Sequence, residues 1–201
     1  MKVDKYKDKQ ADVIADVLSA LITDDKHKAA EIARKEYCFS PYQPVRRRYS
    51  EYQSMRVFLR DSFTDRYSGQ RLIFPGLLRM LSVILPEEFP AHKHWKMSES
   101  HIVYWELFPT IDHIIPVARG GEDVEDNWVT TSMLRNQAKG HWLLEELGWS
   151  LKDRTQQKEW DGLTRMILDY LDKNLERQSI PYLKRWYRAA KRSMESELET
   201  V

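Results

Sequence analysis

Apolar residues recur every three to four positions in the N-terminal part of the chain. This spacing predicts helical structure over residues 5–36, with an interruption at residues 23–25 and a second helix over residues 28–37. Pro41 and Pro44 disfavour helix beyond this point, so we expect a linker or extended arm over residues 38–50. The apolar positions of the first helix are Val13, Ile14, Val17, Leu18, Leu21 and Ile22.

Three consecutive arginines, Arg46, Arg47 and Arg48, lie in this arm. Such a run is either a solvated surface segment or a set of contacts to nucleic-acid phosphates. The pattern leaves both interpretations open.

Shorter apolar segments, separated by turn residues, follow in the middle of the chain. Ser132 is expected to cap a helix that follows the last of them. The pattern predicts, in order, a helix or strand over 51–60, a short strand over 71–74, a helix over 77–85, a polar loop over 86–100, and strands over 110–116 and 128–131.

The last third of the chain has helical spacing. One helix is expected over residues 141–147, ending at Gly148, and another over residues 153–175. Pro181 is well placed to begin a final helix that runs to about residue 199. The predicted fold class is therefore α+β, with a small pair of strands in a mainly helical chain.

Composition narrows the class of protein. Hydrophobic residues make up 42% of the chain, which argues against disorder, and no apolar run reaches the length of a membrane span. The first residues lack the apolar core of a secretory signal, and Cys38 is the single cysteine, so we expect a cytoplasmic protein without a disulfide or a cysteine-rich zinc site. Cys38 itself is expected to be partly buried. The net charge of +1 gives no global sign of a nucleic-acid partner.

Candidate chemistry concentrates in residues 111–141. Asp112 and His113 are adjacent in an apolar strand, where a polar pair is costly unless a metal, a substrate or a structural hydrogen bond satisfies it. Asn127 begins the second strand, and Asn136 and Lys139 share one face of the following helix. An acid, an imidazole and amides that converge in this way suit a hard metal ion and a general base.

The order of these residues resembles the HNH nuclease motif. Asp-His is followed by Pro, Gly-Gly, Asp-Asn and Asn-x-x-Lys, with Asn127 14 residues after His113 and Asn136 9 residues after Asn127. These spacings are similar to those of the HNH domain of RNA-guided CRISPR nucleases. The resemblance implies a small ββα-metal module in a nuclease domain over residues 51–148. Residues 1–50 would then form a helical region with a basic arm, and residues 149–201 helices packed on or beside the nuclease domain.

The resemblance also implies a role for each matching residue. His113 would be the general base that activates water, Asp112 and Asn136 the ligands of Mg²⁺ or Mn²⁺, and Asn127 the residue that holds the first strand and the loop. The products would carry 5′-phosphate and 3′-hydroxyl ends. The expected partner is DNA, with RNA not excluded, and cutting both strands of a duplex would favour a homodimer. Phosphate contacts are expected from Lys139 and, with surface charge as the alternative, from Arg119, Arg135 and His141.

The sequence departs from the family at one place. Many HNH proteins carry two Cys-x-x-Cys pairs that bind a structural zinc, and here the corresponding places are Asp65 to Ser68 and Ser132 to Arg135. We expect a scaffold without structural zinc, held by packing, with hydrogen bonds from Asp65 and Ser68 as a further possibility. The packing residues would be Phe63, Tyr67, Leu72, Phe74 and Trp128.

Two questions stay open at this level. His92, His94 and His101 are either solvated loop histidines or contacts to DNA beside the cleavage site. The chain as a whole is interpreted as an HNH endonuclease, the alternative being an inactive HNH scaffold that binds nucleic acid or another protein.

Overall fold

The computed structural model describes residues 9–38, 49–154 and 159–198. The chain divides into two compact units, Met1–Arg46 and Arg47–Val201. The arginine triplet lies outside the described residues, so the interpretation of Arg46, Arg47 and Arg48 as phosphate contacts stays a prediction.

The first unit contains a helical hairpin. Helix α1 (Lys9–Ile22) and helix α2 (Lys26–Glu36) are separated at the interruption that the sequence predicts, and the Asp25 side chain caps α2 by accepting a hydrogen bond from the backbone N–H of Lys28 at 2.9 Å. Cys38 is exposed, which corrects the expectation of partial burial, because it follows the end of α2.

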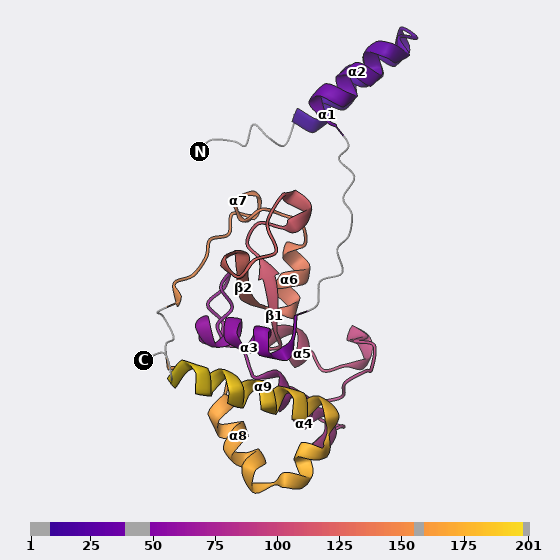
Figure 1. Cartoon of the computed structure of the whole chain (residues 1–201). Helices are drawn as coiled ribbons and strands as arrows, with labels where there is room; N and C mark the ends of the chain where they lie inside the picture. The colour runs from indigo at the N-terminus through magenta and orange to yellow at the C-terminus, as the bar shows by residue number, and fades with distance from the viewer. Residues whose placement is uncertain (1–8, 39–48, 155–158, 199–201) are drawn as a thin grey trace. The chain divides into compact units, whose positions relative to one another are not determined.

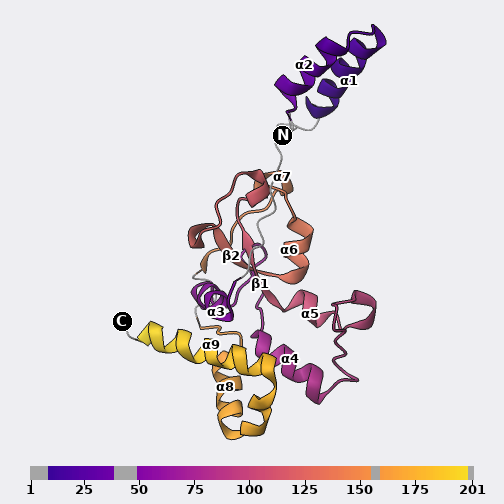
Figure 2. The ribbon, with the colours of Figure 1, turned by 45° about the vertical axis from the view of Figure 1, so that its right-hand side comes forward.

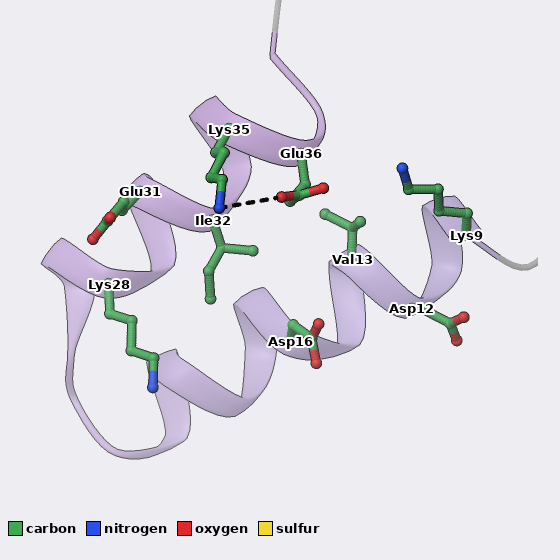
Figure 3. A pocket seen from close by; sticks show the side chains of 9 residues that line it. All are labelled: Lys9, Asp12, Val13, Asp16, Lys28, Glu31, Ile32, Lys35 and Glu36. Atoms are coloured by element: carbon green, nitrogen blue, oxygen red, sulfur yellow. Dashed lines mark ion pairs between the residues drawn. The ribbon is translucent and has the colours of Figure 1, made fainter.

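A groove of about 490 Å³ lies between these two helices (Figure 3). Val13 and Ile32 point into it, and charged side chains of both signs surround them, including the ion pair of Lys35 and Glu36. Mixed charges around a small apolar strip are typical of a solvated helix pair, so the groove indicates no particular ligand.

The second unit holds the remaining elements (Figures 1 and 2). Its two strands and the helix after them follow the ββα order that the resemblance implies. Among its described residues, the α-helices and strands are α3 (Glu51–Arg60), α4 (Pro75–Ile84), α5 (Val103–Glu106), β1 (Pro109–His113), β2 (Trp128–Ser132), α6 (Met133–Lys139), α7 (Leu144–Leu147), α8 (Thr164–Lys173) and α9 (Pro181–Leu198). Short 3₁₀ turns cover Met97–Glu99, Val117–Arg119, Glu125–Asn127 and Leu175–Ser179.

Strands β1 and β2 form an antiparallel pair. Asp112 lies opposite Val129, and His113 lies opposite Trp128, so the Asp-His pair ends β1 where the chain enters the intervening loop. The Ser132 hydroxyl accepts a hydrogen bond from the Arg135 backbone N–H at 3.2 Å and caps α6, as predicted. The α+β class predicted from the sequence is confirmed.

Helix α3 connects the strands to the main hydrophobic core. In Figures 1 and 2 the strands, α6 and α7 lie on one side of α3, and α4, α8 and α9 lie on the other. Because α3 touches both groups, it links the core to the two strands. Buried members of this core include Met55, Phe58, Phe63, Phe74, Ile167, Leu171, Leu183 and Trp186.

Two predicted elements differ from the structure. Residues 71–74 are not a strand. Arg71 forms an isolated antiparallel bridge with Thr64, and beyond it the Ile73 N–H donates to the Leu107 carbonyl and the Phe74 N–H to the Gly162 carbonyl, so the pairing does not continue. The helix expected over residues 153–175 is confined to α8, which is preceded by Gly162 and Leu163, both with positive φ. Within the described residues, no helix is long and apolar enough to cross a membrane.

Candidate active site

The carboxylate of Asp112 is buried and tightly held. Its Oδ2 accepts a hydrogen bond from the Tyr67 hydroxyl at 2.6 Å and pairs with the Lys139 ammonium at 3.0 Å. Burial, together with the negative charge of Asp112, raises the pKa of Tyr67 above its ordinary value, so this hydroxyl remains a donor at neutral pH. Asp112 is therefore fixed in orientation through one of its two oxygens.

Lys139 is completely buried. Besides its ion pair with Asp112, its ammonium donates a hydrogen bond to the backbone carbonyl of His113 at 2.6 Å. The side chain thus ties α6 to the last two residues of β1. In this position Lys139 contacts both Asp112 and His113, so the phosphate contact that the resemblance implies for it stays a prediction.

His113 is held by a carboxylate on the following loop. Its Nε2 lies 2.8 Å from Asp123 Oδ1, and the same oxygen accepts hydrogen bonds from the Tyr49 hydroxyl at 2.8 Å and the Trp128 indole N–H at 2.9 Å. Partial burial opposes the ionisation of Asp123, but the hydrogen bonds from His113, Tyr49 and Trp128 outweigh it and lower the pKa of Asp123. Because an ionised carboxylate only accepts hydrogen bonds, His113 Nε2 must donate, and a neutral ring then carries its lone pair on Nδ1.

Asn127 closes the loop between the two strands. Its side-chain oxygen accepts a hydrogen bond from the Ile115 N–H at 2.9 Å, and its amide nitrogen donates to the Ile115 carbonyl at 2.9 Å and the Glu122 carbonyl at 2.8 Å. Gly121 lies so close that a Cβ there would be 1.9 Å from the Ile115 carbonyl oxygen. The loop that carries Asp123 back to His113 is therefore both pinned by an amide and tightly packed.

Asn136 faces β1 from helix α6. Its amide nitrogen donates to the Thr110 hydroxyl at 3.0 Å and the Ile111 carbonyl at 3.2 Å, so the amide lies beside the residue that precedes Asp112. The described residues contain no cluster of three or more His, Cys, Asp or Glu that could hold a metal ion. The side-chain oxygens of Asp112 and Asn136 are available as metal ligands. A small set of oxygen ligands, completed by water, fits a hard cation such as Mg²⁺ or Mn²⁺.

The scaffold around the site is joined by a buried carboxylate. Asp65 Oδ1 accepts the backbone N–H groups of Tyr67 at 2.9 Å and Ser68 at 3.1 Å. Asp65 Oδ2 accepts the Ser132 N–H at 2.9 Å and the Thr131 hydroxyl at 3.1 Å. One side chain thus joins the two segments that correspond to the Cys-x-x-Cys pairs of the HNH motif, and the possibility that Asp65 hydrogen-bonds to nearby backbone is confirmed.

A second buried carboxylate, Asp61, joins α3 to β2. Its Oδ2 accepts the Thr130 N–H at 2.8 Å, and its Oδ1 lies within 3.3 Å of guanidinium nitrogens of Arg60, Arg66 and Arg154. Arg60 also donates to the Trp128 carbonyl at 2.6 Å. The arginines therefore compensate the negative charge of Asp61. Through Arg60 and Asp61, Trp128 and the rest of β2 are also anchored to α3.

The remaining candidate residues contact other acidic residues or lie exposed. Arg119 pairs with Glu146 at 2.8 Å, Arg135 lies 3.6 Å from Asp65, and His141 is exposed. The backbone N–H of His94 donates to His92 Nδ1 and that of Val103 donates to His101 Nδ1, so two of the three loop histidines are engaged locally.

A comparison with known families agrees with this geometry. Residues 100–133 match the HNH endonuclease family model. The match includes Asp112, His113 and Asn127 and ends before Asn136, and it confirms the HNH resemblance found in the sequence. At the level of the family, the HNH match indicates nuclease-type activity and action on nucleic acids. No curated protein and no solved structure matches the chain.

Three residues that contact Asp112 or His113 could not be predicted from the sequence. Asp123, Tyr49 and Tyr67 reach Asp112 or His113 from the loop or from segments far along the chain. Only Asp123 had a usable signal, since the Gly120-Gly121 turn reverses the chain and brings the following residues back toward the end of β1.

Proposed function

We propose that this chain is a metal-dependent endonuclease that hydrolyses phosphodiester bonds in DNA, with His113 as the general base. The observation that carries the proposal is the contact of His113 Nε2 with Asp123 at 2.8 Å. A carboxylate at this place selects the ring tautomer in which Nδ1 can accept a proton, which is the state that a general base needs.

His113 would take a proton from the attacking water at Nδ1. The imidazolium formed in this step would be stabilised by Asp123, which is already ionised and oriented by Tyr49 and Trp128. Asn127 would keep the loop in the shape that brings Asp123 to His113.

Asp112 and Asn136 would hold one Mg²⁺ or Mn²⁺ ion. When bound, such an ion offsets the negative charge that grows on the scissile phosphate and on the leaving oxygen. Lys139 and Tyr67 would position Asp112, because both contact the same carboxylate oxygen, Oδ2, and Oδ1 would then be the oxygen that binds the metal. Cleavage with the 3′ oxygen as the leaving group would produce 5′-phosphate and 3′-hydroxyl ends.

Each such site cuts one strand. Cleavage of both strands of a duplex would then need two sites, which a homodimer would supply. RNA has the same phosphodiester chemistry, so the cleavage assay should include it beside DNA.

A plasmid-nicking assay tests the proposal. Supercoiled DNA is incubated with the full chain and Mg²⁺ or Mn²⁺, beside His113→Ala and the control His27→Ala, whose exposed side chain lies in the first unit. Wild type and His27→Ala should nick the plasmid, His113→Ala should not, and a DNA ligase that requires 5′-phosphate and 3′-hydroxyl ends should reseal the nicks.

The other outcomes separate the alternatives. Equal nicking by His113→Ala would reject His113 as the base. Binding of DNA without nicking, with either metal, would favour an inactive HNH scaffold. The absence of both binding and nicking would favour a protein that acts through another partner.

A further inference from the structure

A small aromatic cavity lies outside the candidate active site. Its volume is about 260 Å³, slightly below the range typical of pockets for drug-sized ligands, and helix α4, the loop before α5 and the first turn of α9 enclose it. Four aromatic side chains line it: Trp95, Tyr104, Phe108 and Tyr182. A space of this size and lining suits one flat, unsaturated ring.

Trp95 is held in an unusual way at the mouth of this cavity. It is a non-glycine residue with a φ of 54°, a left-handed conformation that costs free energy, and 44% of it is exposed. Edge-to-face contacts with Phe108 at 5.6 Å and Tyr104 at 6.1 Å orient its indole ring. The surrounding residues thus keep a large apolar ring partly in solvent, at the cost of backbone strain, which is the arrangement expected of a stacking surface for a ligand.

The charges around the cavity favour an anionic ligand. Arg79 and Lys93 line it and are exposed, while none of the described residues that line it is acidic. His92 also contributes to the wall, and its Nε2 lies 3.6 Å from the carboxylate of Glu99, which is not itself part of the lining. Aromatic rings combined with basic side chains are the usual composition of sites for single-stranded nucleic acid.

The cavity is close to the HNH site along the chain. Phe108 immediately precedes β1, and Asp112 follows four residues later, which corresponds to about 13 Å of extended strand. We propose that this cavity binds one unstacked base of the DNA strand, a few nucleotides from the scissile phosphate, with Trp95 stacked on the base and with Arg79 and Lys93 on neighbouring phosphates. The choice of DNA and of its cleavage rests on the proposed function, whereas the binding of a base is testable without cleavage.

A binding assay without divalent metal isolates the inference. The full chain in EDTA is titrated into a fluorescein-labelled oligothymidylate of about ten nucleotides, within the roughly 4–16 nucleotides that single-strand sites commonly cover, and anisotropy gives Kd. Trp95→Ala should raise Kd by about 5-fold to 150-fold, the usual effect of removing one stacking side chain, and Trp95→Tyr should stay within about threefold of wild type. Trp142→Ala is the matched control, since Trp142 is 53% exposed and lies outside the cavity.

A second probe separates base from phosphate binding. An oligonucleotide of the same length with abasic positions should bind wild type more weakly than oligothymidylate does, and Trp95→Ala should make little difference to it. Equal affinity of wild type for the two probes, or equal effects of Trp95→Ala and Trp142→Ala, would overturn the inference, as would no binding of oligothymidylate at all.

Two further variants keep the test decisive. If thermal unfolding shows that Trp95→Ala is not folded, the double variant Arg79→Ser and Lys93→Ser replaces it, because both side chains are exposed. That variant should raise Kd for oligothymidylate, and an unchanged Kd would overturn the inference. His113→Ala should bind oligothymidylate like wild type. If wild type binds oligothymidylate but does not nick plasmid, that result would count against the proposed function and leave the base-binding cavity standing.

Discussion

The substitution Asp65→Ala tests whether a carboxylate has taken the place of a structural metal in this fold. Asp65 is completely buried and accepts four hydrogen bonds, two from the turn at residues 67–68 and two from the end of β2. Alanine removes the acceptor and leaves two buried segments without the group that joins them.

The expected loss of stability is about 3–5 kcal/mol. Hydrogen bonds to a charged group are worth roughly 1.5–3 kcal/mol each, so a simple sum would approach the whole stability of a typical domain, about 5–15 kcal/mol. The variant also avoids the cost of burying the carboxylate, and neighbouring hydrogen bonds are not additive, so the net effect should match that of breaking a buried ionic group, about 3–5 kcal/mol.

Urea unfolding followed by tryptophan fluorescence measures this loss. All seven tryptophans lie in the second unit, so the signal reports the unit that contains Asp65. With a slope of about 2 kcal/mol per molar urea, the midpoint of Asp65→Ala should fall by roughly 2 M, while Asp169→Ala, an exposed position on α8, should stay within about 0.3 M of wild type. A midpoint for Asp65→Ala as close to wild type as that of the control would refute the reasoning.

Three more predictions concern the loop and the scaffold. Gly121→Ala places a Cβ 1.9 Å from the Ile115 carbonyl, so the loop must shift, and kcat for nicking should fall at least ~10-fold with oligothymidylate binding unchanged. The lowered pKa of Asp123 stabilises the fold above the ordinary carboxyl value of about 3.9, so the difference in unfolding midpoint between wild type and Asp123→Asn should be constant near neutral pH and should shrink as pH falls below about 4. A variant with cysteine at four positions should bind zinc tetrahedrally; the positions are Asp65, Ser68, Ser132 and Arg135. About one zinc per chain should be detected, and EDTA should lower the urea midpoint of unfolding.

Local signals predicted the backbone of the site well. Asp112 and His113 lie at the end of a strand because apolar residues surround them, and Ser132 begins α6 because its hydroxyl can cap a helix. These features depend on neighbours in sequence, and the spacing of the HNH motif placed them in the correct order.

Contacts between distant segments could not be predicted in the same way. Tyr67 reaches Asp112 across 45 residues, and Tyr49 reaches Asp123 across 74 residues. The resemblance implies a phosphate contact for Lys139, whose ion pair with Asp112 inside the protein depends on the packing of α6 on β1. Because lysine is rarely buried, the sequence alone does not indicate this ion pair. The strand expected at residues 71–74 failed for a related reason, since its backbone bonds to loops that periodicity does not describe.

The Asp65 junction also determines which cellular conditions the fold tolerates. A scaffold closed by thiolates depends on zinc supply and is open to oxidation of its sulfur atoms. Here the carboxylate of Asp65 joins the same two segments and needs no metal ion to do so. The single cysteine, Cys38, lies elsewhere in the chain. Peroxide or zinc starvation should therefore leave this junction intact.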